Sequence, residues 1–137
     1  VLYNEPMNTN KIALQTNNGQ YVCAENGGGS NLVANRDWIL AWETFRQIDL
    51  GNNEVALQAA NGQYVCAENG GGSNLVANRD WILAWETFRR IDLGNNKVAL
   101  QAANGQYVCA ENGGGSNLVA NRDWILAWET FGIEELQ

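Results

Sequence analysis

Six tryptophans occur in this chain as three identical pairs. The first of each pair follows an aspartate, in Asp-Trp-Ile-Leu-Ala, and the second begins Trp-Glu-Thr-Phe. An exposed indole ring is a good platform for a sugar, because the C–H face of the sugar stacks on the aromatic face. The candidate sugar-binding residues are therefore the first tryptophans, Trp38, Trp81 and Trp124. The alternative is that these side chains plug the open end of a barrel.

Carboxylates and amides near the tryptophans would bind pairs of sugar hydroxyls, since each makes two hydrogen bonds in one plane. The candidate carboxylates are Asp37, Asp80, Asp123, Glu25, Glu68 and Glu111. The candidate amides are Asn26, Asn69, Asn112, Gln20, Gln63 and Gln106. The aspartates are the stronger candidates, because Glu25 is expected to pair with Arg36 across adjacent strands.

Catalytic chemistry is poorly supported. The chain contains no histidine, which removes the commonest general base and metal ligand. Cysteine thiols without a histidine partner are weak candidates for nucleophiles. Glu25 and Asp37 resemble a glycosidase pair in type, but three identical active sites on such short units would be unusual. We therefore expect a protein that is not an enzyme.

The glycine-rich segment Asn-Gly-Gly-Gly-Ser-Asn lacks the Lys-Ser/Thr of a phosphate-binding loop and the alternating acids of a calcium loop. Its glycines are expected to allow positive φ in a tight connection. Neither a metal nor a cofactor is expected. One cysteine recurs per unit, at Cys23, Cys66 and Cys109, and this odd set predicts reduced thiols in strands rather than a disulfide framework.

The elements that carry these residues repeat. The stretch QYVCAENGGGSNLVANRDWILAWETF begins at Gln20, Gln63 and Gln106 without a substitution, a spacing of 43 residues. Such a period indicates stacked or symmetric units. Any site in this stretch must therefore exist three times.

One unit predicts four short strands. In the middle unit they are 54–58, 63–68, 75–79 and 85–93, with an Asn-Gly hairpin turn after the first and loops at 69–74 and 80–84. Three such units predict an all-β fold, the twelve-stranded β-trefoil with pseudo-threefold symmetry. A propeller needs at least four blades, and a solenoid would need polar end units.

We expect a single domain over 1–137, with units at 11–53, 54–96 and 97–137 after a lead-in at 1–10. The last strand, from Phe131, is expected to return to the first unit, with Val1–Met7 beside it. The net charge of −7 argues against nucleic acid or an anionic membrane as partner, and no signal peptide is recognised. A monomer is expected.

Residues 11–136 resemble the fascin-like branch of β-trefoil domains. The resemblance rests on Val-Ala-Leu-x-Ala-x-Asn-Gly-x-Tyr-Val-x-Ala-Glu, then Leu-Val-Ala-Asn-Arg and Trp-Glu-x-Phe. It implies either carbohydrate binding, as in modules attached to bacterial glycoside hydrolases, or actin bundling. It also implies that the tryptophan of Trp-Glu-Thr-Phe fills the core, which concerns Trp42, Trp85 and Trp128. Natural members have diverged units, so three identical copies favour a designed protein over a recent natural duplication.

Three hypotheses follow. The first is a trivalent, lectin-like carbohydrate-binding module, with β-glucan as a candidate ligand. The second is a designed symmetric scaffold that retains no ligand. The third, actin binding, is the weakest, because a single acidic domain lacks the basic patches of an actin-bundling protein. A natural carbohydrate-binding module would be secreted, whereas a designed protein would be a recombinant product.

Overall fold

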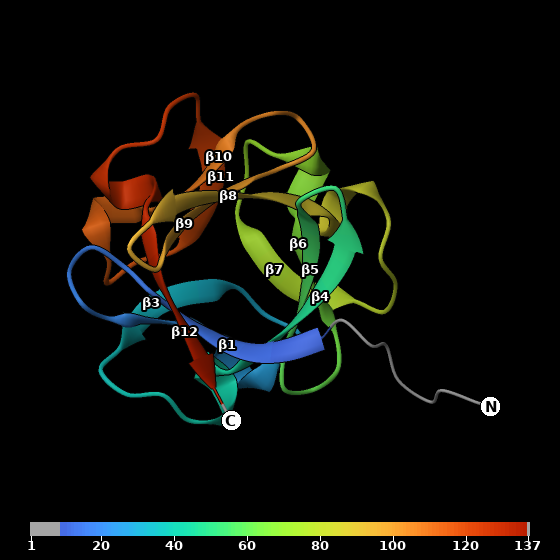
Figure 1. The fold of residues 1–137 in the computed structure, drawn as a ribbon. Coiled ribbons are helices and arrows are strands. Elements are labelled where there is room, and N and C mark those ends of the chain that lie inside the picture. Colours follow the sequence, from blue (N-terminus) through green and yellow to red (C-terminus); the bar gives the residue numbers. More distant parts are fainter. Residues whose placement is uncertain (1–8, 137) are drawn as a thin grey trace.

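The computed structural model describes residues 9–136, and the segment Val1–Met7 lies outside them. The first unit holds β1 (Thr9–Gln15), β2 (Tyr21–Ala24), β3 (Leu32–Arg36) and β4 (Phe45–Gly51). The second holds β5 (Glu54–Gln58), β6 (Tyr64–Ala67), β7 (Leu75–Arg79) and β8 (Phe88–Gly94). The third holds β9 (Lys97–Gln101), β10 (Tyr107–Ala110), β11 (Leu118–Arg122) and β12 (Phe131–Leu136). The fold is a β-trefoil, as predicted, and its three units follow one another around a common centre (Figure 1).

The first and fourth strands of each unit close a six-stranded barrel. Antiparallel pairs join β12 to β1, β1 to β4, β4 to β5, β5 to β8, β8 to β9 and β9 to β12. The predicted return of the last strand to the first unit is confirmed, because Ile12 pairs with Glu135. Closure leaves no unpaired strand edge around the barrel.

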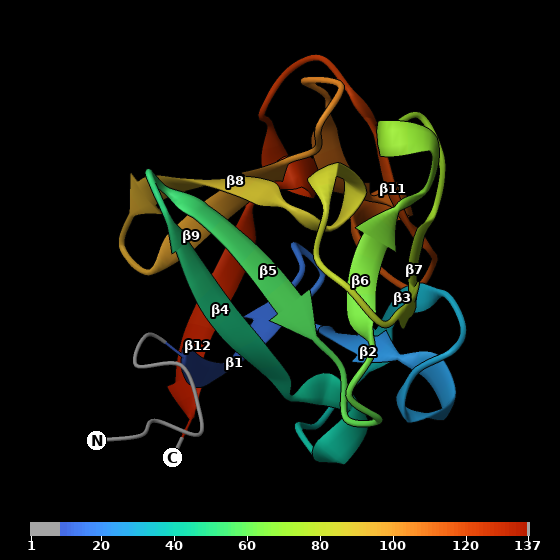
Figure 2. The same ribbon diagram turned by 90° about the vertical axis from the view of Figure 1, so that its right-hand side faces the viewer.

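The second and third strands form hairpins that cap one end of this barrel. They are β2–β3, β6–β7 and β10–β11, each with a register shift after its tyrosine. Figure 2 shows the barrel strands at the left and β2, β3, β6, β7 and β11 at the right. Single bridges join the hairpins, such as Asn31 with Val76 and Asn74 with Val119.

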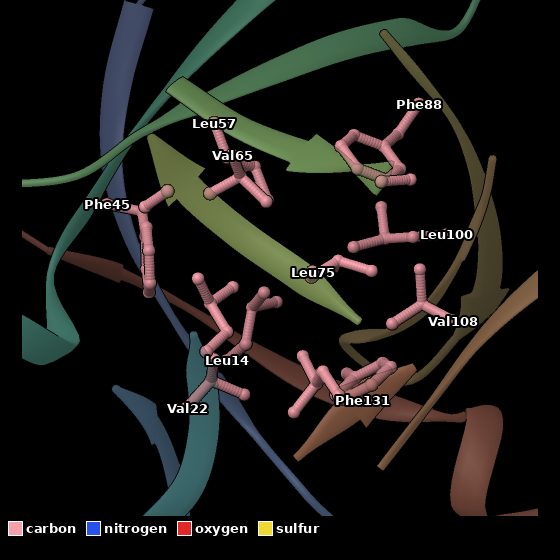
Figure 3. Close-up of a cluster of buried hydrophobic side chains, with 14 of the residues drawn as sticks. Leu14, Val22, Phe45, Leu57, Val65, Leu75, Phe88, Leu100, Val108 and Phe131 are labelled. Carbon is pink, nitrogen blue, oxygen red and sulfur yellow. The ribbon is translucent and has the colours of Figure 1, made fainter. Parts of the chain in front are cut away.

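The core repeats the same apolar residues three times. Figure 3 shows Leu14, Leu57 and Leu100, then Val22, Val65 and Val108, and then Phe45, Phe88 and Phe131 converging. All three phenylalanines are fully buried, at 0% exposure. Because strand residues alternate between two faces, Val22 and Ala24 belong to this core cluster, whereas Cys23 between them is buried outside it.

The units also interlock through their glycine loops. The backbone N–H of Asn61 donates to the carbonyl of Gly27 at 2.9 Å, and the Asn61 side chain lies against Gly28. The same contact joins Asn104 to Gly70 and Gly71, and Asn18 to Gly113 and Gly114. Each loop therefore seats the hairpin turn of the next unit, which the repeated sequence could not reveal.

Two local expectations need correction. The fourth strand starts at Phe88 rather than Trp85, because Ala84–Glu86 form a short 3-10 helix, η4. Its equivalents are η2 (Ala41–Glu43) and η6 (Ala127–Glu129), and the glycine loops begin with η1 (Glu25–Gly27), η3 (Glu68–Gly70) and η5 (Glu111–Gly113). At the predicted Asn-Gly turn only Gly62 has positive φ, whereas Asn52 and Asn53 both have it at the β4–β5 turn. Two successive positive φ values are typical of a type I′ hairpin.

Candidate functional site

The candidate tryptophans lie on the surface between the third and fourth strands. Trp38 is 52% exposed in the connection after β3, so it does not plug the barrel. Trp42, on η2, is 39% exposed, so the expectation that it fills the core is wrong. Leu40 lies between them and is also exposed. Each unit thus presents an apolar surface of two indoles and one leucine, which marks an interaction site better than scattered apolar residues do.

In two units this surface encloses a shallow groove. The groove in the second unit has a volume of about 390 Å³ and is lined by Arg79, Trp81, Leu83, Ala84, Trp85 and Glu86. The groove in the third unit has a volume of about 310 Å³ and is lined by the equivalent residues, Arg122, Trp124, Leu126, Ala127, Trp128 and Glu129. Sequence analysis missed Trp85, Leu83 and Arg79 as lining residues. The only usable signal of this groove in the sequence was the pair of tryptophans in each unit.

A buried glutamate shapes each groove. Glu43 is 2% exposed, and its Oε1 accepts a hydrogen bond from the backbone N–H of Leu40 at 2.7 Å. The hydroxyl of Thr44 donates to the Leu40 carbonyl at 2.8 Å. These two bonds close the turn that holds Trp42 and Leu40 outward. The same bonds recur with Glu86 and with Glu129.

The second tryptophan is fixed against the glycine loop. A Cβ on Gly27 would lie 3.0 Å from Nε1 of Trp42, so the indole rests directly on the backbone there. Gly70 and Gly113 make the same contact with Trp85 and Trp128. This support holds the ring in place although much of it remains exposed. Such a preorganised aromatic surface loses little entropy when a ligand stacks on it.

The aspartates are joined to the predicted amides. Nε2 of Gln63 donates to Oδ1 of Asp80 at 3.2 Å, and Nδ2 of Asn61 donates to Oε1 of Gln63 at 2.8 Å. The first unit has the longer Gln20–Asp37 contact of 3.4 Å, and the third has Gln106–Asp123 at 3.2 Å. Each aspartate precedes its tryptophan and is exposed. The structure thus brings together Gln63 and Asp80, next in sequence to Trp81.

The glutamates belong to a different cluster. Arg79 Nη2 and Glu68 Oε1 are 2.9 Å apart, and the equivalent Arg36–Glu25 and Arg122–Glu111 distances are 3.2 and 3.1 Å. The predicted pairing of Glu25 with Arg36 is confirmed. Asn69, with its equivalents Asn26 and Asn112, takes a positive φ of 62° inside the loop helix. Glu68 is not among the residues that line the groove of the second unit, although its partner Arg79 is.

The cysteines lie behind the grooves, in the middle strands. Cys66 is fully buried and free, as expected of a reduced thiol in a strand, and so are Cys23 and Cys109. Burial, followed by a hydrogen bond to Glu86, raises the pKa of Cys66 to about 12. Cys23 and Cys109 have pKa values raised to about 12 for the same reasons, with Glu43 and Glu129 as partners. A thiol that stays protonated at neutral pH is not a nucleophile.

Within residues 9–136, no group of three or more histidine, cysteine, aspartate or glutamate side chains is arranged to hold a metal ion. In the same part of the chain, no helix has the length and apolar character needed to cross a membrane.

One family model matches the chain twice, at positions one repeat apart. A family model described as "Domain of unknown function (DUF7910)" matches residues 7–65 and again residues 50–108. The chain belongs to the DUF7910 family. The two matches of the DUF7910 model start one repeat apart. Each match is longer than one repeat, so the model spans more than one unit. No curated protein matches the chain. The fascin-like resemblance stays a prediction.

Solved structures share the fold of this DUF7910 member at low identity. A designed 3-fold symmetric protein, ThreeFoil, has a TM-score of 0.82 and 20% identity, and the match covers 92% of this chain and 99% of ThreeFoil. SeviL, solved bound to asialo-GM1 saccharide, has a TM-score of 0.75 and 12% identity, over 93% of this chain and 98% of SeviL. An exo-β-1,3-galactanase from Clostridium thermocellum has a TM-score of 0.79 and 11% identity, over 99% of this chain and 32% of the galactanase. This chain therefore spans about a third of that enzyme.

The buried glutamate gives a testable stability prediction. Glu86→Ala removes the acceptor of the Leu83 N–H and of the Cys66 thiol, so we expect a loss of about 3 kcal/mol in unfolding free energy. Glu86→Gln keeps a carbonyl acceptor and should recover most of that loss. Urea denaturation measures both variants. Glu68→Ala, which removes a partly exposed ion pair with Arg79 and a long hydrogen bond from Asn78, is the control and should cost less than about 1 kcal/mol. Equal losses for Glu86→Ala and Glu68→Ala would contradict the assigned role.

Proposed function

We propose that this protein is a non-catalytic, trivalent carbohydrate-binding module. Each unit binds a sugar ring on its exposed tryptophan, Trp38, Trp81 or Trp124, and the neighbouring aspartate accepts hydrogen bonds from sugar hydroxyls. The observation that carries the proposal is the threefold repetition of a preorganised surface with two exposed indoles, which encloses a groove in the second and third units. SeviL, a trefoil of similar size bound to a saccharide, supports it by analogy of fold.

Three weak sites act together on a polymer. A single stacked ring contributes only about 1 kcal/mol, so a monosaccharide is expected to bind weakly. A polysaccharide that engages two or three grooves at once gains effective concentration and binds far more tightly. A soluble β-glucan such as laminarin is the first ligand to test.

Titration of laminarin into the protein, followed by tryptophan fluorescence and by calorimetry, tests this function. We expect saturable binding, an affinity loss of about tenfold for Trp38→Ala alone, and no measurable binding when all three groove tryptophans are alanine. Leu50→Ala with Leu93→Ala is the control, because those leucines are also exposed apolar residues, at 39% and 40%, but lie outside the grooves. Binding that survives in the triple tryptophan variant would refute the proposal.

The second candidate is a designed symmetric scaffold that retains no ligand. The three identical 26-residue copies favour it, as does the fold shared with a designed threefold protein. It predicts cooperative unfolding at high temperature and no binding on a glycan array. A saturable response to any glycan on the array that depends on the groove tryptophans would exclude it. Actin binding remains the weakest alternative, and co-sedimentation with filaments tests it.

A further inference from the structure

Equivalent clefts between neighbouring units are lined by chemically different residues. In the first unit the cleft has a volume of about 520 Å³, between β1, β4 and the β5–β6 turn. Lys11 on β1 and Arg46 on β4 are direct cross-strand neighbours, and both line it. Ala41, Thr44, Gln58 and Ala59 also contribute to the lining.

This cationic pair forms no salt bridge among the described residues. Within residues 9–136, neither Lys11 nor Arg46 has a carboxylate oxygen within 4.0 Å. The recorded side-chain hydrogen bond of Arg46 goes to the neutral hydroxyl of Thr9, at 3.4 Å. Like charges directly opposite each other destabilise a sheet. In a chain of net charge −7, two facing cations that line a cleft offer a site for an anion.

The other two units provide natural comparisons. In the second unit the equivalent neighbours are Glu54 and Arg89, whose formal charges cancel, although within residues 9–136 no salt bridge shorter than 4.0 Å joins them. In the third they are Lys97 and Gly132, and the cleft they line has a volume of about 340 Å³. The double positive charge is therefore a property of the first unit and not of the fold.

The cleft adjoins the proposed sugar groove. In the third unit Ala127 lines both the tryptophan groove and the interunit cleft. Its equivalent in the first unit, Ala41, lines the cationic cleft, on the same 3-10 turn that carries Trp42. A saccharide that stacks on the tryptophans can thus extend over this alanine toward Lys11 and Arg46.

We propose that the cleft of the first unit binds the anionic group, a carboxylate or a sulfate, of an acidic saccharide. The next sugar ring stacks on the adjoining tryptophan groove. The identity of the carrier as a saccharide rests on the proposed function, whereas anion binding by Lys11 and Arg46 does not. The protein would then combine one acid-selective site with two sites of lower selectivity.

The experiment compares sugars that differ only in charge. Cellobiose, cellobiouronic acid and cellobiose 6-sulfate are titrated at low ionic strength while the amide NMR signals of Lys11 and Arg46 are followed. We expect shifts at both residues with an acidic sugar and at least tenfold tighter binding than for cellobiose. The preference should shrink when salt is added. If only one acidic sugar acts, it identifies the bound group, and equal binding of all three sugars would overturn the inference.

The chain itself supplies the variants. Lys11→Glu reproduces the second unit and Arg46→Gly reproduces the third, so both substitutions are compatible with the fold, and each should abolish the acid preference. Lys97→Glu makes the same charge change in a cleft without an arginine and should leave the preference intact. Glu54→Lys should create a second site for an acidic sugar, so the number of acidic sugars bound per protein should rise from one to two. A preference that survives Lys11→Glu would overturn the inference.

The triple tryptophan-to-alanine variant separates the two proposals. If it loses cellobiose binding but keeps the acid-dependent shifts at Lys11 and Arg46, both proposals are supported. If wild-type protein shows those shifts but no response to neutral sugars in calorimetry, the tryptophan function fails and the anion cleft stands. If neutral sugars bind and the shifts at Lys11 and Arg46 are absent, the anion cleft fails alone.

Discussion

Raising the pH from about 8 to about 11 is expected to destabilise this protein steeply, by roughly 4 kcal/mol per pH unit above pH 9. The cause is the set of three buried thiols, Cys23, Cys66 and Cys109. Each has a pKa raised from 9.0 to about 12 by burial and by its hydrogen bond to a buried glutamate. Denaturant unfolding at a series of pH values, with a reductant present, measures the slope.

The sign follows from proton binding. Above pH 9 the unfolded chain loses its thiol protons, whereas the folded chain keeps them until about pH 12. The stabilisation is therefore complete below pH 9 and is lost as the pH rises toward 12. Each thiol contributes about 1.4 kcal/mol per pH unit, and three act together. Repetition thus makes a modest local effect large.

The triple Cys→Ser variant is the control for this slope. Serine keeps a hydrogen-bond donor for each glutamate but does not ionise in this range. Tyr21, whose pKa is raised by burial and by Glu134, acts in the same direction and remains in both proteins. The difference between the two pH profiles therefore reports the thiols alone. Parallel profiles would contradict the thiol mechanism.

The interlock between units gives the second large effect. Gly28→Ala, Gly71→Ala and Gly114→Ala together are expected to leave the protein unfolded or barely folded at room temperature. Gly71 has a φ of +141°, and an added Cβ would lie 2.2 Å from the side chain of Asn104. Backbone strain and overpacking each cost about 1–3 kcal/mol at such a site. Circular dichroism and thermal unfolding measure the loss.

Single variants make this prediction quantitative. Gly71→Ala alone should cost about 3 kcal/mol or more, and adding Asn104→Gly should recover the overpacking part of that loss. Gly94→Ala is the comparison, because Gly94 also has positive φ but its Cβ would meet nothing within 4 Å. Additive losses for Gly71→Ala and Asn104→Gly would contradict the interlock.

The architecture could be predicted from the sequence because the patterns that indicate strands and turns are local and occur three times. Short alternating runs, such as Glu54–Gln58 and Leu75–Arg79, became strands with those bounds. The turn Ala84–Glu86 was missed, because three residues show no helical periodicity and the Glu86 carboxylate that closes the turn is itself buried. Trp85 was placed in the core because Trp-Glu-Thr-Phe resembles a structural motif of the fascin-like branch, whereas this tryptophan lies exposed on the turn. An aromatic residue on such a turn lies outside the alternation of the strand.

The candidate site was predicted only in part. Trp81 and Asp80 are neighbours in sequence, and the structure joins that aspartate to Gln63. The exposed Leu83 and the seat of Trp85 on Gly70 depend on contacts between loops, which periodicity does not report. The sequence did not reveal the Lys11–Arg46 pair either, because it arises from pairing between strand residues that lie outside the identical copies. Identical local sequence says nothing of which unit is adjacent to which.

The interlock of glycine loop and hairpin turn has a consequence for assembly. Each unit presents a receiving loop on one side and an inserting turn on the other, so the contact between units is heterologous rather than self-complementary. A heterologous contact yields either a ring or an open filament, and here the rotation closes after three units. The chain therefore has the symmetry of a cyclic trimer, with its three units joined in one polypeptide. Its shape is encoded in the contact face of a single unit, and the covalent turns, such as that at Asn52–Asn53, fix only the order of the units.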